Sequence, residues 1–228
     1  MLRKLFRHIP NTITCCNLLS GCMAVTEAFS NNVRAAFLWV LAGALFDFCD
    51  GMSARLLHAY SPIGKELDSL ADLITFGLAP SVLCFKLLDG IEWGTCCLMP
   101  YLAFILAAAS ALRLAIFNTD TEQATSFRGL AVPADALFWC GLVFSAQDTS
   151  SRLAGWLIIA AIAIFSLLMV SRIPMFSLKF KNLSWKDNYI RYIFLIVSAP
   201  VVVFLGLKGT MIVILWYIVL SIATSHDR

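Results

Sequence analysis

Eight apolar stretches, each about 20 residues long and able to span the hydrocarbon core of a bilayer as a helix, follow one another along the chain. They lie near 12–30, 33–56, 66–88, 94–117, 131–147, 153–172, 190–206 and 209–225. Short polar segments separate them. The pattern predicts an all-α integral membrane protein of about eight transmembrane helices. The apolar content of 60% and the mean hydropathy of +0.83 agree, because soluble domains are nearer half apolar.

The distribution of basic residues indicates an orientation. With the N-terminus in the cytoplasm, 13 of the 17 Lys and Arg fall on the cytoplasmic side and 4 outside. We therefore expect a multi-pass protein of the cytoplasmic membrane. The net charge of +3 then reflects topology; it does not indicate a nucleic-acid partner, and anionic lipid headgroups are the expected counterpart.

Polar residues divide the chain into parts. The first nine residues place apolar and basic side chains on opposite helical faces, which predicts a short interfacial amphipathic helix at 1–10, with a plain basic flank as the alternative. A six-helix membrane core at 11–175 carries nearly all the intramembrane polarity. A basic cytoplasmic loop and two C-terminal helices occupy 176–228, and we interpret those helices as scaffold or an oligomer contact.

The eight cysteines lack zinc-type spacing, so we interpret them as small core residues.

Four acids stand within otherwise lipid-compatible segments, where an ionised carboxylate is costly. Asp47 and Asp50 are three residues apart, and Asp68 and Asp72 are four apart, so each pair shares a helical face. The two helices are antiparallel neighbours joined by a short turn, which brings the pairs together. Such carboxylates repel one another unless positive charge lies between them.

Oxygen ligands without His or Cys favour a hard divalent ion, Mg²⁺ or Mn²⁺, and four carboxylates suffice for two ions. One alternative is a set of buried salt bridges with Arg55, Lys65 and Arg113. Another is a divalent-cation transporter, although transport would favour acids spread through the depth of the bilayer. The gathering of the acids at one surface favours a metal site.

Residues beside the acids suit a phosphate ligand. Gly51 and Gly64 allow a ligand or backbone to come close, and Arg55 can donate to a phosphate oxygen. Ser61 and Pro62 suit the start of the next helix, whose amino end carries partial positive charge.

The acids and their neighbours fit one continuous pattern, D-x2-D-G-x2-A-R-x8-G-x3-D-x3-D. Its positions are Asp47, Asp50, Gly51, Ala54, Arg55, Gly64, Asp68 and Asp72. This pattern resembles the signature of the CDP-alcohol phosphotransferase family. The stretches at 9–21, 66–81, 112–118 and 127–138 are similar to the bacterial branch of that family that uses serine as the acceptor.

The resemblance implies an enzyme that transfers the phosphatidyl group of CDP-diacylglycerol to the hydroxyl of L-serine and releases CMP. It implies two metal ions held by the four acids, with Asp72 also acting as general base, in a cavity facing the cytoplasm. It places Gly51 and Ala54 near the cytidine, and it favours a homodimer. The nearest alternative is a member of the same family with glycerol 3-phosphate or an inositol phosphate as acceptor.

Two further groups of polar residues are candidates for substrate contacts. Asn11 and Thr14, with Asn17 as a weaker candidate, form a stripe that can hydrogen-bond the cytidine or phosphates, or otherwise a neighbouring helix. For the carboxylate and ammonium of serine the candidates are Arg113, Arg128 and Asp135. Arg113 can alternatively extend to the membrane interface.

Overall fold

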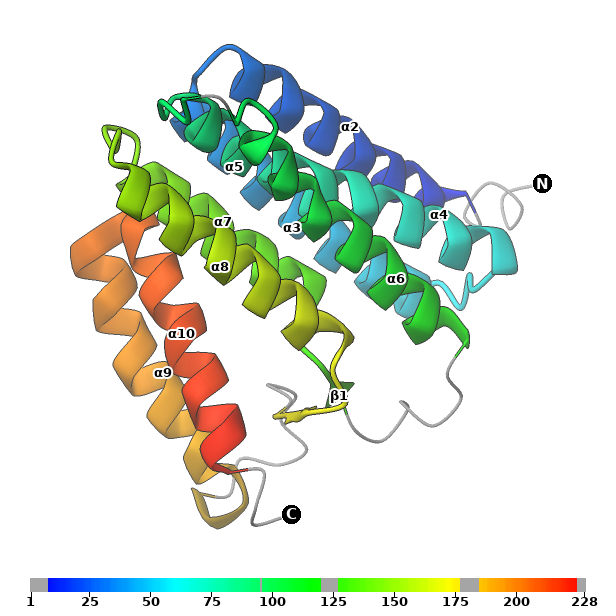
Figure 1. The fold of residues 1–228 in the computed structure, drawn as a ribbon. Coiled ribbons are helices and arrows are strands. Elements are labelled where there is room, and N and C mark those ends of the chain that lie inside the picture. The colour runs from blue at the N-terminus through cyan, green and yellow to red at the C-terminus, as the bar shows by residue number, and fades with distance from the viewer. Residues whose placement is uncertain (1–7, 95, 120–126, 177–184, 225–228) are drawn as a thin grey trace.

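The computed structural model describes residues 8–94, 96–119, 127–176 and 185–224, and it is helical almost throughout (Figure 1). The helices are α2 (Ile9–Phe29), α3 (Val33–Leu56), α4 (Pro62–Asp72), η1 (Leu73–Leu78), α5 (Ala79–Asp89), η2 (Met99–Phe104), α6 (Ile105–Thr119), α7 (Val132–Ser145), α8 (Arg152–Val170), α9 (Trp185–Leu205), η4 (Gly206–Lys208) and α10 (Gly209–Ala223). Two short strands, β1 (Phe127–Arg128) and β2 (Pro174–Met175), pair antiparallel.

The eight predicted apolar stretches correspond to helical segments. The third is α4, η1 and α5 in direct succession, and the fourth is η2 followed by α6. Within the described residues, six segments are long and apolar enough to cross a membrane. The α7 helix is shorter, with 14 residues, and α9 and α10 count as one stretch that doubles back at η4 (Figure 1). The chain is thus an all-α, multi-pass membrane protein. The predicted interfacial helix at 1–10 lies largely outside the described residues.

Local sequence explains where the helices near the acids begin. The side chain of Asn32 caps α3 by accepting a hydrogen bond from the Ala35 backbone N–H at 3.2 Å. Ser61 caps α4 in the same way, accepting from the Gly64 N–H at 3.0 Å, and Pro62 occupies the first turn. The five residues at 57–61 therefore form a short connection from α3 to α4, and both helices pack against α2.

A π-helix interrupts the third predicted helix directly after Asp72. This segment, η1, packs where α2 and α3 present glycines. A Cβ added to Gly21 would lie 2.5 Å from Thr75 Oγ1, and one added to Gly43 would overlap Thr75 Cγ2. Thr75 is completely buried and donates to the Asn17 carbonyl at 2.9 Å. The two glycines thus allow η1 to insert closely between α2 and α3.

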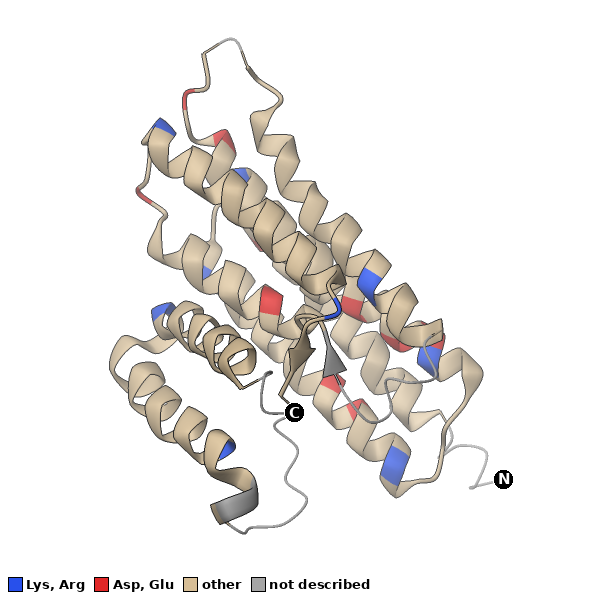
Figure 2. Cartoon of the chain, turned by 60° about the horizontal axis from the view of Figure 1, so that its bottom comes forward, with Lys and Arg blue, Asp and Glu red and all other residues tan. Residues whose placement is uncertain are grey.

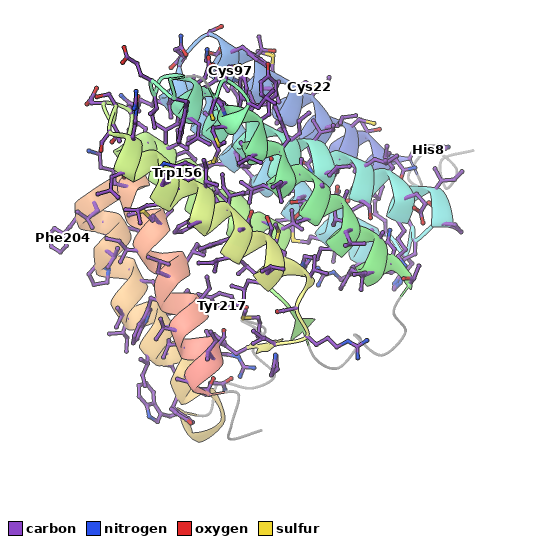
Figure 3. The ribbon with its side chains drawn as sticks, viewed as in Figure 1. His8, Cys22, Cys97, Trp156, Phe204 and Tyr217 are labelled. Atoms are coloured by element: carbon purple, nitrogen blue, oxygen red, sulfur yellow. The ribbon has the colours of Figure 1, made fainter. Side chains whose placement is uncertain are left out.

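The C-terminal hairpin of α9 and α10 docks onto the rest of the bundle through α10 (Figure 1). Thr210 Oγ1 donates to the Leu137 carbonyl of α7 at 3.0 Å. A Cβ at Gly141 would overlap Thr210, so α7 and α10 approach closely. The outer face of α9 is apolar, and Phe204 projects from it with 85% of its surface exposed, as suits contact with lipid (Figure 3).

The interpretation of the cysteines as core residues needs correction. Only Cys84 and Cys140 are buried. The others lie on helix surfaces or, for Cys96 and Cys97, in the segment before η2. In a membrane protein an apolar helix face can meet lipid instead of the core, so apolar context did not predict burial.

Candidate functional site

Three of the predicted metal ligands converge at one end of the bundle. Asp47 and Asp50 lie on the last turns of α3 and Asp68 lies on α4, and each offers a carboxylate oxygen within 4.8 Å of the others. Asp50 Oδ2 and Asp68 Oδ1 are buried without a hydrogen-bond partner in the part of the chain that the structure describes. Buried oxygens of this kind need a partner. The all-oxygen donor set therefore fits a hard divalent cation.

Asp72 lies beside this group and is held by a separate hydrogen bond. It is on the last turn of α4, is 9% exposed, and lies within electrostatic reach of Asp47 and Asp68. Its Oδ1 accepts a hydrogen bond from Asn17 Nδ2 at 3.0 Å. Asn17 was a weaker candidate for the nucleotide; the structure gives it the alternative role, a hydrogen bond between helices.

The π-helix η1 contributes to the placement of Asp72. It starts at the next residue, Leu73, and its Thr75 bonds to the backbone of Asn17, the residue that also holds the Asp72 carboxylate. π-Helical turns inside α-helices are frequent at functional sites. Here Asn17 is bonded twice to the α4–η1 segment, so α2 fixes the position of Asp72 through both side chain and backbone.

A cavity of about 200 Å³ adjoins the acids. Its lining is Pro10, Asn11, Thr14, Asp50, Gly51, Ala54, Ala59, Tyr60, Ser61, Gly64, Lys65 and Asp68. Five of the six residues predicted to bind the nucleotide lipid are among these, and Arg55 is exposed nearby. A Cβ at Gly64 would lie 3.0 Å from Asn11 Oδ1, whereas the space at Gly51 is open apart from Arg55 Nη2 at 3.7 Å. The glycines thus widen this cavity.

The basic residues nearby are bonded to carbonyls. Arg55 Nε donates to the Gly51 carbonyl at 3.0 Å. Lys65 Nζ donates at 2.8 Å to the carbonyl of Asn118 at the end of α6. The Asn118 amide in turn donates to Ser69 Oγ at 2.8 Å. These contacts count against the salt-bridge interpretation, because Arg55 and Lys65 use these donors on backbone oxygens. The role of Lys65 in joining α4 to α6 was not predicted.

A second polar group lies deeper, between α6 and α7. Arg113 is 9% exposed, and its Nε has no hydrogen-bond partner among the described residues. It lies within electrostatic reach of Asp72 and of Asp135, which is 1% exposed and accepts a hydrogen bond from Trp139 Nε1 at 3.1 Å. The structure therefore brings together two of the three predicted serine residues. For Arg128 it describes the backbone, in β1, and not the side chain.

The position of the acids also bears on the transporter alternative. Figure 2 shows the acidic residues of α3 and α4 gathered toward one end of the bundle. Ion paths place ionisable groups along the membrane interior. The fold and site instead define a helical membrane protein in which a carboxylate cluster able to hold a metal adjoins a small cavity.

Comparison with known proteins shows the family to which this membrane protein belongs. Residues 7–177 match the CDP-alcohol phosphatidyltransferase family, and the chain belongs to it. Similar proteins include one from Bacillus subtilis, 38% identical over 128 residues that cover 55% of this chain and 70% of the relative. One from Helicobacter pylori is 33% identical over 180 residues, which cover 77% of this chain and 74% of the relative. One from Mycobacterium leprae is 31% identical over 182 residues, covering 73% of this chain and 57% of the relative.

All three relatives carry the name CDP-diacylglycerol–serine O-phosphatidyltransferase. The family match confirms the resemblance inferred from the sequence, and the chain is an enzyme of this phosphatidyltransferase family. The match ends at residue 177, so α9 and α10 lie beyond it.

Proposed function

We propose that the protein is a phosphatidylserine synthase, which transfers the phosphatidyl group of CDP-diacylglycerol to the hydroxyl of L-serine and releases CMP. One observation carries the proposal: the residues of the signature converge in space, with three carboxylates within 4.8 Å beside a cavity lined by Gly51, Ala54 and Gly64. The names of the relatives support serine as the acceptor.

The carboxylates suit two divalent ions, Mg²⁺ or Mn²⁺. Asp47, Asp50 and Asp68 would hold them, together with Asp72 beside this group. When bound, such ions would neutralise charge on the diphosphate and on the departing CMP.

The protein side chains supply orientation and proton transfer. The serine oxygen attacks the phosphorus that carries diacylglycerol, and the bond from that phosphorus to the CMP oxygen breaks. Asp72 accepts the serine hydroxyl proton, in an orientation that Asn17 fixes. Arg55 donates to a phosphate oxygen.

The cavity would bind the donor, CDP-diacylglycerol, and the deeper polar group of Arg113 and Asp135 would bind the acceptor, serine. Cytidine lies against Gly51 and Ala54, with Asn11 and Thr14 as donors or acceptors, while the acyl chains remain in the bilayer. Arg113 and Asp135 offer opposite charges, which match the carboxylate and ammonium of a zwitterion. A phosphate-bearing acceptor would need denser positive charge than this, and the ammonium of Lys65 is bonded to Asn118. Arg128 is a further candidate for the serine carboxylate.

The charge distribution supports placing the protein in the cytoplasmic membrane with the site facing the cytoplasm. A homodimer is proposed from the resemblance to the family.

The experiment supplies the purified protein with CDP-diacylglycerol and either serine, glycerol 3-phosphate or inositol phosphate, and measures CMP. We expect CMP release with serine, its loss with a chelator, and its return on addition of Mg²⁺ or Mn²⁺. Faster release with a phosphate-bearing acceptor would assign a different member of the family. Metal uptake into proteoliposomes without CMP formation would favour a transporter.

A further inference from the structure

Tyr217 of α10 reaches from the C-terminal hairpin toward the loop that follows α8 (Figure 3). Its hydroxyl donates a hydrogen bond to the Phe176 carbonyl at 2.9 Å. Its ring centroid lies 4.9 Å from that of Phe176 and 5.9 Å from that of Phe194 on α9. Tyr217 thus connects both helices of the hairpin to the segment just after β2.

That segment is paired with the one leading into α7. Phe176 directly follows β2, which pairs with β1, the strand that contains Arg128. The Gly129 N–H extends the pairing by donating to the Ile173 carbonyl at 2.9 Å. Gly129 has a φ of +72° and its α-carbon faces the Met169 carbonyl so closely that a Cβ would overlap it. The strand pair therefore packs closely against the end of α8, and Tyr217 bonds to the residue that follows β2.

Tyr217 also lies close to the polar group between α6 and α7. Together with Asp72 of α4 and Asp135 of α7, it is within electrostatic reach of the Arg113 guanidinium. The surroundings of Arg113 therefore include α10, although α10 lies beyond the family match. The bond from Thr210 to Leu137 and the close approach at Gly141 fix α10 against α7, the helix that contains Asp135.

We propose that Tyr217 is a positioning residue of the acceptor site: its hydroxyl fixes the Phe176 carbonyl and, through it, the β1–β2 pair that contains Arg128, next to the polar group of Arg113 and Asp135. This inference rests on the proposed function, because it assigns the polar group of Arg113 and Asp135 to the acceptor. The C-terminal hairpin then forms part of the acceptor site, beyond the role of scaffold or oligomer contact expected from its apolar sequence.

The test is Tyr217→Phe, which removes the hydroxyl and keeps the ring. We expect the KM for serine to rise about three- to tenfold, as for the loss of one partly buried hydrogen bond, with the KM for CDP-diacylglycerol unchanged. The matched control is Tyr189→Phe, the same chemical change at a side chain of α9 that is 45% exposed, where both constants should stay at wild-type values. An unchanged KM for serine, or an equal rise for both substrates, overturns the proposal.

Hydrogen exchange separates positioning from a general effect on stability. In Tyr217→Phe we expect faster exchange at 127–130 and 173–176, with unchanged protection in α3 and α4. Faster exchange throughout the protein would mean that the hydroxyl stabilises the whole fold, which overturns the positioning role. If the wild type uses an acceptor other than serine, the proposed function fails, and the same comparison made with that acceptor decides the role of Tyr217.

Discussion

Asp72 differs from Asp50 and Asp68 in its hydrogen bonding. One of its oxygens accepts from the Asn17 amide, whereas Asp50 and Asp68 each keep a buried oxygen without a partner among the described residues. A carboxylate held at one oxygen can present the other in a fixed direction. That property suits a general base, since proton transfer depends on the position of the accepting atom.

The substitution Asp72→Asn tests this role. The amide has nearly the same shape, and its oxygen can still accept from Asn17, but it cannot take up a proton at neutral pH. We expect CMP release with serine to fall by at least about a hundredfold, while the thermal unfolding midpoint stays near that of the wild type. Wild-type turnover in the folded variant would remove Asp72 from the mechanism.

At this scale, sequence reasoning finds residues that are close along one helix and misses those joined across the fold. The spacing of Asp47 and Asp50 was sufficient to pair them. The bond from Asn17 to Asp72 spans 55 residues, and that from Tyr217 to Phe176 spans 41, so no local pattern indicates either. Arg113 and Asp135 were predicted as separate candidates for the charged groups of serine, and their proximity emerged only from the packing of α6 and α7.

Among the helical elements, η1 is one that the apolar pattern could not predict. The stretch near 66–88 predicts one continuous helix, because a π-helical insertion leaves hydrophobicity unchanged. Its cause is tertiary: Thr75 occupies the space left by Gly21 and Gly43. The helices themselves were predictable from apolar length, whereas the shortness of α7 and the β1–β2 pair depend on the packing around them.

The substitution Gly21→Ala should disturb this element. The new methyl group would lie 2.8 Å from the Thr75 Cα, and the backbone cannot yield as easily as a flexible side chain. We expect a loss of about 1–3 kcal/mol in the free energy of unfolding, together with slower CMP release as Asp72 shifts.

The matched control is Gly90→Ala, where the nearest atom to the new methyl group would be the Leu87 carbonyl oxygen at 3.5 Å, an ordinary contact. Its unfolding free energy should remain within about 0.5 kcal/mol of the wild type. Equal stability of the two variants in denaturant titrations would show that η1 does not depend on close packing at Gly21.

On the scale of the whole molecule, the chain has two chemically different ends. The acids, their cavity and the α3–α4 turn lie at one end, whereas Cys97 lies at the end remote from His8 (Figure 3). The distribution of Lys and Arg was the basis for assigning the catalytic end to the cytoplasm.

Thiol labelling tests that orientation. In a protein that retains only Cys96 and Cys97, both exposed, a membrane-impermeant maleimide added to cells with a permeable outer envelope should modify these residues. A cysteine introduced by Tyr60→Cys, at a position that is 72% exposed in the α3–α4 turn, should react only after the membrane is opened. The reverse pattern would place the catalytic end outside.

The gathering of the acids at one end has a consequence for the membrane that houses the enzyme. A lipid whose head group is exchanged at that end, while its tails stay in the hydrocarbon, is made in a single leaflet. Under the proposed function, each turnover replaces the nucleotide diphosphate head group with phosphoserine on one side only, so the product is at first confined to one leaflet. Any of this lipid on the opposite side must arrive by a separate translocation step.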